Sequence, residues 1–173
     1  MNIYPNLEKL TIIIPTYNKH MELINVINFW IKYNVKILIL DGSDLKLKYD
    51  FSKTQNINYI HSAENFYSRL LSSTKYIKTE FVLLSCDDEF YLPSALSSCV
   101  DFLIKNSTYS SCGGCTIGFV KNSSEKLYGL ENPPSLKGRH LNDDCPIKRA
   151  KSHFSNYAMS HLWSVTRFNK WEI

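Results

Sequence analysis

The stretch 81–93 constrains the fold of this chain more than any other. Phe81–Leu84 is a run of four apolar residues, which is typical of a buried strand and too short for a lone helix. The acidic run Asp87–Glu89 follows closely, and Pro93 then opens a predicted helix, because proline is tolerated in a first helical turn. The sequence therefore predicts a buried strand, an acidic turn and a helix in succession.

Carboxylates at the end of a buried strand have two interpretations. In open α/β sheets, ligands bind at the carboxyl ends of the strands. Neighbouring carboxylates raise each other's pKa unless a cation neutralises them, and oxygen-only ligand sets suit Mg²⁺ or Mn²⁺. Asp87 and Asp88 are therefore candidate ligands of a divalent cation that also holds a phosphate. The alternative is an exposed acidic turn that caps the next helix, and this stretch alone does not separate the two.

The amino-terminal part predicts parallel strands. Leu10–Ile14 is apolar and mostly β-branched, and it predicts a first buried strand that Pro15 ends. Apolar residues at helical spacing predict a helix over 19–33, and a second strand follows at 35–40. A strand, a helix and a strand within about thirty residues form a βαβ unit with parallel pairing and a right-handed crossover.

The remaining elements continue up to about residue 120, and beyond Lys121 loop residues become more frequent. In chain order we expect a strand at 57–61, a helix at 64–78, a helix at 93–105, one or two strands within 109–120, a helix at 148–157 and a strand at 162–167. The predicted fold class is therefore α/β, with a mostly parallel, Rossmann-like sheet flanked by helices.

Polar residues follow three of the predicted strands. Pro15–Asn18 comes after the first strand, Asp41 after the second and Asp87 after the central one. In a parallel sheet these ends line one edge, which then offers an aromatic ring for stacking, a carboxylate for a base or ribose, and metal ligands for a diphosphate. Neither a GxGxxG turn nor a GxxxxGK[ST] loop occurs, which disfavours a dinucleotide dehydrogenase and a P-loop NTPase.

The composition excludes several partners and compartments. The 173 residues suffice for one domain or slightly more, and a net charge of +4 on scattered lysines and arginines gives no basic patch for nucleic acid. No signal peptide is recognisable, and the most apolar stretch, 24–40, is interrupted by polar residues, so no transmembrane segment is predicted. Five cysteines, an odd number without secretory context, indicate reduced thiols in the cytoplasm.

Three motifs together resemble family 2 glycosyltransferases of the GT-A fold. They are the segments 11–19 (TIIIPTYNK), 39–43 (ILDGS) and 84–88 (LSCDD), and their order and spacing are more specific than any one of them. The similarity covers residues 9–105. It implies a GT-A-like donor-binding domain at 1–121 and a loop-rich start of an acceptor-side portion at 122–173.

The resemblance also implies roles for individual residues. Pro15, Thr16 and Tyr17 are expected to lie beside the nucleotide. Asp41 is expected to contact the base. Arg69, on the helix before the acidic motif, is expected to lie near the nucleotide as well.

The acidic motif is expected to bind both nucleotide and metal. Asp87 is assigned to the nucleotide, and Asp87 and Asp88 together to Mn²⁺ or Mg²⁺. The common pattern in the family is Asp-x-Asp-Asp, but its first position here is Ser85, so it stays open which aspartate coordinates directly. We interpret Glu89 as a cap of the following helix.

The catalytic base remains unassigned. Members of this family invert the anomeric centre, which requires a carboxylate to deprotonate the acceptor hydroxyl. The acidic pair Asp143–Asp144 lies C-terminal to the metal motif, and we interpret it as a solvated turn. We interpret His161 as a structural histidine, and Tyr157, Trp163 and Trp171 as core aromatics.

The sequence as a whole predicts a metal-assisted, inverting glycosyltransferase that uses a nucleotide-diphosphate sugar and an unknown glycan, lipid or protein acceptor. A nucleotidyltransferase and a non-catalytic nucleotide-sugar-binding module are the alternatives. The resemblance implies bacterial surface glycan synthesis in the cytoplasm or at the inner face of the membrane, although no basic amphipathic anchor stands out. Because the chain stops at Ile173, soon after the last predicted strand begins, we expect a truncated member that transfers sugar weakly or not at all.

Overall fold

The computed structural model describes residues 3–114, 117–121, 127–131, 140–155 and 163–171. The chain divides into two compact units, Met1–Cys112 with Leu162–Ile173 and Gly113–His161. The last strand of the chain returns to the sheet of the first unit, so Leu162–Ile173 is grouped with Met1–Cys112. The division at residue 121 into a donor-binding part and an acceptor-side part stays a prediction.

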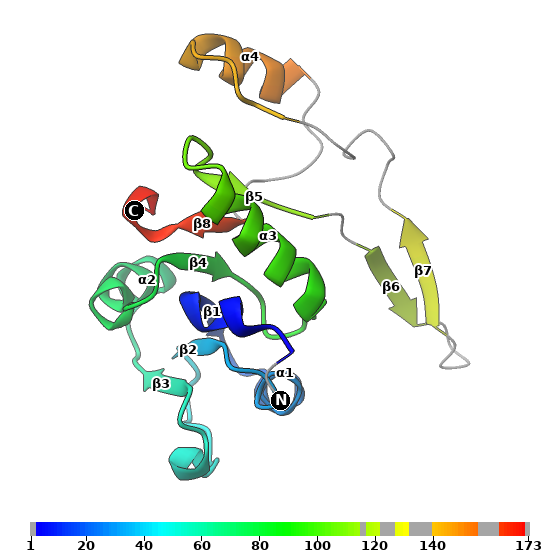
Figure 1. Ribbon diagram of the computed structural model, residues 1–173. Helices are drawn as coiled ribbons and strands as arrows, with labels where there is room; N and C mark the ends of the chain where they lie inside the picture. Colours follow the sequence, from blue (N-terminus) through cyan, green and yellow to red (C-terminus); the bar gives the residue numbers. More distant parts are fainter. Residues whose placement is uncertain (1–2, 115–116, 122–126, 132–139, 156–162, 172–173) are drawn as a thin grey trace. The chain divides into compact units, whose positions relative to one another are not determined.

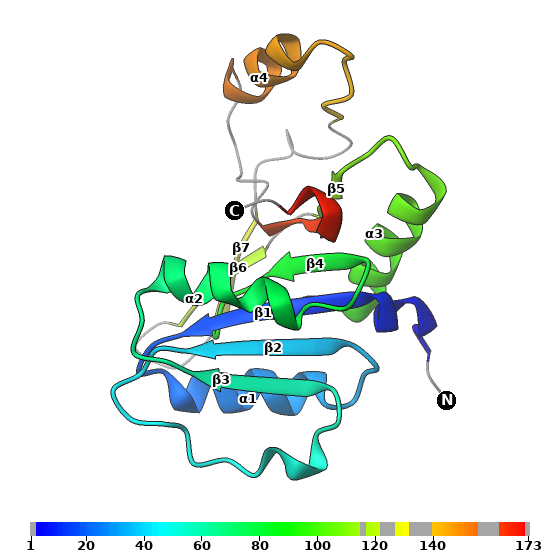
Figure 2. The same cartoon turned by 90° about the vertical axis from the view of Figure 1, so that its left-hand side faces the viewer.

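The first unit is built on a six-stranded sheet (Figures 1 and 2). In spatial order its strands are β3 (Ile57–His61), β2 (Lys36–Asp41), β1 (Leu10–Thr16), β4 (Phe81–Leu84), β8 (Val165–Arg167) and β5 (Ser111–Cys112). The pairs β1–β2, β1–β4 and β2–β3 are parallel, whereas β8 runs antiparallel to both β4 and β5. This mostly parallel α/β sheet confirms the predicted fold class.

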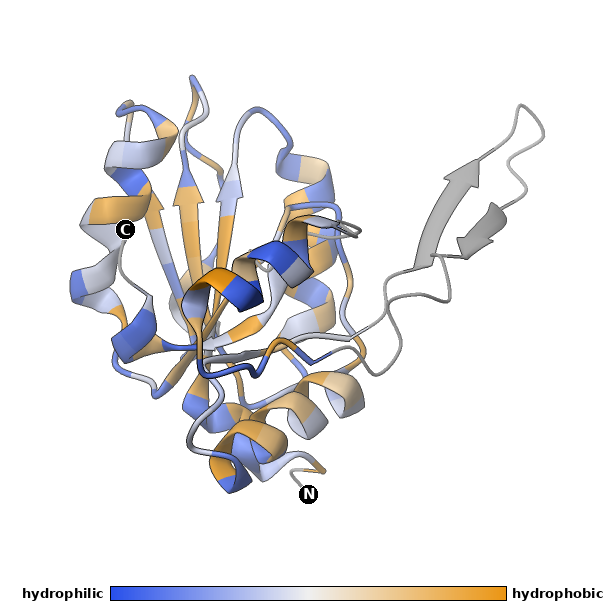
Figure 3. Cartoon of the chain, turned by 90° about the horizontal axis from the view of Figure 1, so that it is seen from above, coloured by the Kyte–Doolittle hydropathy of each residue, from blue (hydrophilic) through white to orange (hydrophobic). Residues whose placement is uncertain are grey.

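The strand order creates a topological switch between β1 and β4. The chain passes outward from β1 to β2 and β3, and then returns to the other side of β1 to form β4. The register pairs Thr16 with Asp41 and Ile13 with Leu84, so the carboxyl ends of β1, β2 and β4 share one edge. Figure 3 shows polar loops beyond the apolar strands at this edge, where open α/β sheets bind ligands.

Helices cover both faces of the sheet (Figure 2). α1 (His20–Trp30) and α3 (Pro93–Lys105) pack against one face, and α2 (Phe66–Ser73) packs against the other. Ile12 belongs to the core beneath α1 and α3, and Ile13 to the core beneath α2, because successive side chains of a strand point to opposite faces. Short 3-10 helices lie at η1 (Pro5–Lys9), η2 (Phe51–Lys53), η3 (Thr74–Tyr76) and η6 (Phe168–Lys170).

Pro15 is part of β1, although the sequence predicted that it ends the strand. Its missing N–H is tolerated because the pairing of β1 with β4 ends at Ile13 and Leu84, so Pro15 lies beyond that ladder. Extending β1 by these residues brings Thr16 level with Asp41 on the neighbouring strand.

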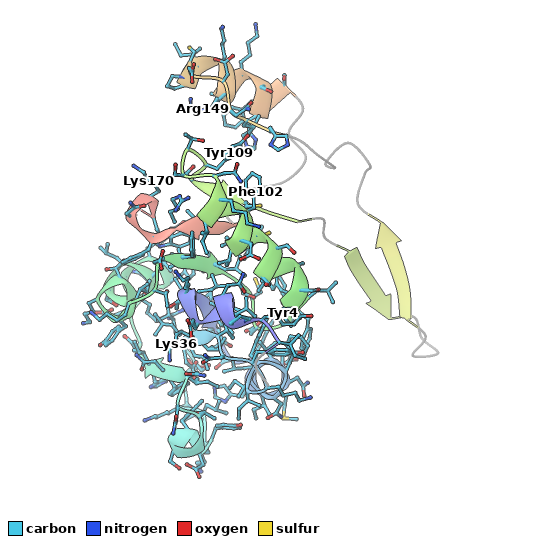
Figure 4. All side chains as sticks on the ribbon, in the orientation of Figure 1. Tyr4, Lys36, Phe102, Tyr109, Arg149 and Lys170 are labelled. Atoms are coloured by element: carbon cyan, nitrogen blue, oxygen red, sulfur yellow. The ribbon has the colours of Figure 1, made fainter. Side chains whose placement is uncertain are left out.

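The strand β8 is fastened by the side chain of Arg167. Its Nε donates to the carbonyl of Tyr109 at 2.9 Å, and its Nη2 donates to the carbonyl of Leu103 at the end of α3. The rings of Phe102 and Tyr109 meet edge to face beside it, with 5.1 Å between their centroids (Figure 4). These contacts join the carboxyl-terminal strand to the helix that follows the acidic motif.

The second unit contains β6 (Ile117–Lys121) and β7 (Leu127–Glu131), which pair antiparallel, and α4 (Pro146–Ser155). β7 was not predicted. None of the residues of α4 is buried. No helix in the described part of the chain combines the length and the apolar character that crossing a membrane requires.

Candidate functional site

The candidate site begins where β1 and β4 end. Thr16 Oγ1 donates a hydrogen bond of 2.7 Å to Asp87 Oδ2, and both residues are buried. Asp87 is 6% exposed, so this bond satisfies one oxygen of a carboxylate that is largely removed from water. The two predicted strand ends therefore meet through side chains at the switch point.

Lys19 forms ion pairs with both aspartates of the acidic motif. Its Nζ lies 3.0 Å from Asp88 Oδ2 and 3.5 Å from Asp87 Oδ1. The hydrogen bond to Asp88, together with the charges of Asp87 and Asp88, raises the pKa of Lys19. Lys19 therefore offsets part of the negative charge of the two aspartates in this structure.

The acidic pair fits a magnesium or manganese ion that is shared with a ligand. Asp87 and Asp88 lie side by side and offer only oxygen atoms, which is the ligand type these ions prefer. No group of three or more histidine, cysteine, aspartate or glutamate side chains in the described segments is arranged to hold a metal ion. Because Mg²⁺ is usually held by one or two carboxylates plus waters and phosphates, two aspartates suffice when a diphosphate supplies further oxygens.

Asp41 is a fully buried carboxylate, with no exposed surface. Its Oδ1 accepts from the backbone N–H of Ser43 at 2.8 Å, and its Oδ2 accepts from the hydroxyl of Tyr59 at 2.5 Å and lies 3.2 Å from His20 Nε2. Burial alone raises the pKa of Asp41, but the hydrogen bonds from Ser43, Tyr59 and His20 outweigh it and lower the pKa. Asp41 is thus an ionised anchor that holds three residues in place.

The loops after β1 and β2 are joined by a small hydrogen-bond network. Asn18 has a φ of 54°, a left-handed conformation that asparagine tolerates better than most residues. Its backbone N–H donates to Ser43 Oγ at 2.8 Å, and its Nδ2 donates to Asp44 Oδ2 at 3.0 Å. Tyr17 donates to Asp44 Oδ1 at 3.2 Å while its side chain stays largely exposed, so its ring is available for stacking.

Arg69 is a buried cation behind the second strand end. It is 8% exposed, its Nη1 donates to the carbonyl of Glu64 at 2.6 Å, and its Nε is buried without a hydrogen-bond partner. No carboxylate in the described residues lies within 4.0 Å of its guanidinium. The guanidinium packs over Gly42, where an added Cβ would lie 1.8 Å from Arg69 Nη1.

Glu89 does not cap the helix, and this prediction was wrong. α3 begins at Pro93 with Leu92 as N-cap and no side-chain cap bond. Glu89 Oε2 instead accepts from the backbone N–H of Cys86 at 3.3 Å and from the hydroxyl of Tyr91 at 3.1 Å. Glu89 therefore stabilises the acidic turn and not the helix. Three residues separate Glu89 from Pro93, where α3 begins.

Cys86, inside this turn, is not activated as a nucleophile. Burial raises the pKa of its thiol to about 11, and the charges of Glu89, Asp88 and Asp87 add to the effect. Since the thiolate is the reactive form, the thiol stays inert near neutral pH.

The structure brings together most of the residues that the sequence singled out at the strand ends. Thr16, Asp87 and Asp88 form one group, and Asp41 lies level with Thr16 on the neighbouring strand. Sequence reasoning missed Lys19, although it stands at the end of the first motif, because its partner Asp88 is 69 residues away.

The acceptor-side residues have mixed outcomes. Asp143 Oδ1 accepts from the backbone N–H of Cys145 at 2.9 Å and Asp143 is exposed, which agrees with the predicted solvated turn. Trp163 and Trp171 are partly buried against the core beneath α2, as expected for core aromatics. Tyr157 and His161 lie outside the described residues.

The fold and the site together define a class of protein. The sheet is mostly parallel and carries paired carboxylates at the switch point between β1 and β4, which is where open α/β sheets bind ligands. The chain matches the model of the family described as Glycosyl transferase family 2 over residues 11–164. It therefore belongs to glycosyltransferase family 2.

Solved structures are similar to this chain at low sequence identity. The crystal structure of S. aureus TarS has a TM-score of 0.60 and 16% identity, covering 92% of this chain and 28% of TarS. The TarS fragment 1–349 has a TM-score of 0.50 and 17% identity, covering 57% of this chain and 33% of that fragment. The Pyrobaculum calidifontis mannosyltransferase PcManGT, in complex with GDP-Man and Mn²⁺, has a TM-score of 0.48 and 16% identity, covering 60% and 34%.

The chain thus spans about a third of the length of the first structures it matches. None of the curated proteins matches it.

Proposed function

We propose that this chain binds a nucleotide-diphosphate sugar and takes part in a metal-assisted, inverting transfer of its sugar, of the hexosyltransferase type, to a hydroxyl acceptor. Membership of the family supports sugar transfer as the reaction class. The observation that carries the proposal for this particular site is the charge pattern of the sheet edge. A buried arginine that has no carboxylate partner among the residues described belongs to the same edge as a pair of aspartates.

Arg69 is the proposed phosphate-binding residue. A buried cation is costly unless an anion compensates it, and a guanidinium matches the geometry of phosphate oxygens. Its backbone partner Glu64 and its contact with Gly42 hold the guanidinium beside the end of β2. The negative charge of a nucleoside diphosphate is the natural complement of this group.

The nucleoside is proposed to lie along Pro15, Thr16 and Tyr17. Tyr17 supplies an exposed ring on which a base stacks. Asp41 contributes to the same site, and because its carboxylate is covered in this conformation, its contribution runs through the groups that it holds, Ser43 and Tyr59.

Asp87 and Asp88 are the proposed ligands of Mn²⁺ or Mg²⁺. A divalent cation bound there neutralises charge on the leaving diphosphate. Thr16 keeps the Asp87 carboxylate fixed by its hydrogen bond, so the protein side of the site is already ordered.

The two alternative functions differ from the proposed one in different ways. A nucleotidyltransferase usually has a glycine-rich, basic phosphate loop after the first strand, and Pro15–Asn18 has neither character. A non-catalytic binding module would share the donor site but would not break the bond between sugar and diphosphate. The two remaining possibilities are therefore separated by turnover and not by binding.

The protein is proposed to be located in the cytoplasm and to bind peripherally at the inner face of the membrane. The sequence did not point to a basic anchor, but α4 supports the contact because it carries Lys148, Arg149 and Lys151 together with two exposed apolar side chains, Ile147 and Phe154. Basic and apolar groups on one short helix suit the surface of an anionic bilayer. A glycan, a lipid or a protein at that surface is the proposed acceptor, and bacterial surface glycan synthesis the proposed process.

The proposal is tested by binding and by donor hydrolysis. Uridine, guanosine and adenosine diphosphates are titrated into the protein by calorimetry, with Mn²⁺ and with EDTA. We expect one of them to bind in a Mn²⁺-dependent manner, and its sugar conjugate to be hydrolysed slowly. Absence of any nucleoside diphosphate binding would refute the donor site, whereas tight binding without any hydrolysis or transfer would identify a binding module.

A further inference from the structure

The ammonium of Lys19 occupies the space between the two proposed cation ligands. Its Nζ approaches Asp88 Oδ2 at 3.0 Å and Asp87 Oδ1 at 3.5 Å. The other oxygen of Asp87, Oδ2, already accepts from Thr16. Lys19 therefore faces the Asp87 oxygen that Thr16 leaves open and one of the two oxygens of Asp88.

The fold holds the backbone at Lys19 on both sides. On one side is Asn18, whose left-handed conformation is tied to the loop after β2 through Ser43 and Asp44. On the other side α1 begins at His20, and the carbonyl of Lys19 accepts from the backbone N–H of Leu23 at 3.0 Å. The fold thus fixes the backbone position from which the half-exposed side chain of Lys19 reaches Asp87 and Asp88.

A divalent cation and this ammonium compete for the same carboxylate oxygens. Two cations at adjacent positions repel each other, and repulsion is strong where one ligand, Asp87, is largely shielded from water. If the ammonium leaves, it needs another anion, and the phosphates of a bound nucleotide provide one.

Resting on the proposed donor site, we propose that Lys19 is a resident counter-ion of Asp87 and Asp88 that a divalent cation must displace. The diphosphate then receives the displaced ammonium. Metal ion and nucleoside diphosphate consequently bind cooperatively, and each binds weakly without the other. By thermodynamic linkage, the diphosphate raises the affinity for metal by the same factor as the metal raises the affinity for diphosphate.

The test measures binding of Mn²⁺ alone, without nucleotide, by electron paramagnetic resonance of the free ion. Lys19→Met removes the charge and keeps a similar stem, and it should bind Mn²⁺ about tenfold more tightly than the wild type, within the usual range of coupling. Lys9→Met is the matched control, because Lys9 forms a comparable 2.8 Å ion pair with Glu80 at the other end of β1. That control should leave Mn²⁺ affinity unchanged.

The cooperativity is measured in the same proteins with uridine diphosphate, after correction for the Mn²⁺–nucleotide complex in solution. The factor by which the nucleotide tightens Mn²⁺ binding should be several-fold larger in the wild type than in Lys19→Met, in which only the direct coordination of the ion by the diphosphate couples the two ligands. Lys19→Gln serves as second variant should the methionine variant fail to fold.

Two results overturn the proposal: equal Mn²⁺ affinity of wild type and the Lys19 variants, and no Mn²⁺ binding by the variants at all. Failure of the proposed function has a different signature. It shows as absence of nucleoside diphosphate binding by the wild type, and the comparison with Mn²⁺ alone decides the role of Lys19 in either case.

Discussion

Thr16 Oγ1 donates a 2.7 Å hydrogen bond to Asp87 Oδ2 and thereby joins two strand ends that lie 71 residues apart in the sequence. The bond crosses the switch point between β1 and β4, where the register ends at Ile13 and Leu84 and the N–H of Ser85 donates to the carbonyl of Ile13 at 2.9 Å. A side-chain contact therefore takes over from the backbone ladder at the place where the sheet opens toward a ligand.

Thr16→Val tests this contact, since valine has nearly the same shape and lacks the hydroxyl. Hydrogen bonds to charged groups contribute about 1.5–3 kcal/mol, so we expect Mn²⁺-dependent nucleoside diphosphate affinity to fall about tenfold or more. Calorimetry measures the change. Thr11→Val is the control: its hydroxyl lies 2.6 Å from that of Thr79 in the first half of the same strand, and its loss should not alter nucleotide affinity. An equal loss of nucleotide affinity in both variants would show that the Thr16 hydrogen bond contributes to the stability of the fold and not to the binding site.

Gly42→Ala should displace Arg69. The added Cβ would lie 1.8 Å from Nη1 and 2.3 Å from Cζ of the guanidinium, so the side chain of Arg69 must move. We expect weaker binding of nucleoside diphosphate, by about tenfold, with Mn²⁺ and with EDTA alike, because one charge-assisted bond to phosphate is lost. Gly114→Ala is the control, since a Cβ there meets nothing within 4 Å. Unchanged affinity of Gly42→Ala would exclude Arg69 from phosphate binding.

Asp87→Asn and Asp88→Asn should remove metal dependence. Each variant loses one carboxylate of the proposed ion site, so addition of Mn²⁺ should no longer improve nucleoside diphosphate binding. Binding in EDTA should persist, since Arg69 and the strand-end loops are untouched. Calorimetric titrations with Mn²⁺ and with EDTA provide the comparison. A wild type that binds equally in both conditions would remove the metal from the mechanism.

The predictable part of the fold is the part encoded locally. The strands 57–61 and 81–84 and the helix 93–105 have the predicted bounds, because apolar periodicity and Pro93 mark them within single short segments. By contrast, β8 has three residues and β5 has two, and their antiparallel pairing joins residues far apart in the sequence. No local pattern specifies such a pairing, and it is decided by packing.

In the candidate site as well, only the residues with a local sequence signal could be predicted. Asp41, Asp87 and Asp88 were found because acidic residues directly after apolar strands are a local signal. Lys19 and Tyr59 were not found, since their importance lies in partners that only the folded sheet brings near. The error at Glu89 has the same origin: proximity to a helix start suggested a cap, whereas the turn itself offered the nearer donor in Cys86.

The basic helix α4 gives a prediction about membranes. Lys148→Glu with Lys151→Glu should lower co-sedimentation with phosphatidylglycerol vesicles tenfold or more, because each basic residue near an anionic surface contributes about 1 kcal/mol and reversal adds repulsion. The matched control is Lys75→Glu with Lys78→Glu, which changes the same net charge at the same spacing on the first unit. The same loss in both double variants would indicate a general effect of net charge, and no binding by the wild type would exclude the membrane contact.

Asp41 gives a prediction about acid stability. Its hydrogen bonds hold its pKa below the ordinary value of 3.8 despite its burial. The folded protein therefore binds the proton less readily than the unfolded chain does, so this carboxylate contributes stability above about pH 4 that is lost as the pH falls through the folded pKa. Asp41→Asn should lose about 1.5–3 kcal/mol of unfolding free energy at pH 7, because one of the donors to Asp41 is left facing an amide N–H₂.

The same variant should lose less stability than the wild type when the pH is lowered from 5 to 3, since the titrating group is gone. Urea unfolding at several pH values measures both effects. Asp50→Asn is the matched control: Asp50 accepts from the N–H of Ser52 at 3.0 Å as Asp41 does from Ser43, but in an exposed turn where water replaces the lost bond. Equal losses at pH 7 for the two variants, or the same acid dependence in wild type and Asp41→Asn, would show that burial of Asp41 adds nothing to its bonds. The expected difference arises because the Asp41 carboxylate has no exposed surface through which water can take over from Ser43 and Tyr59.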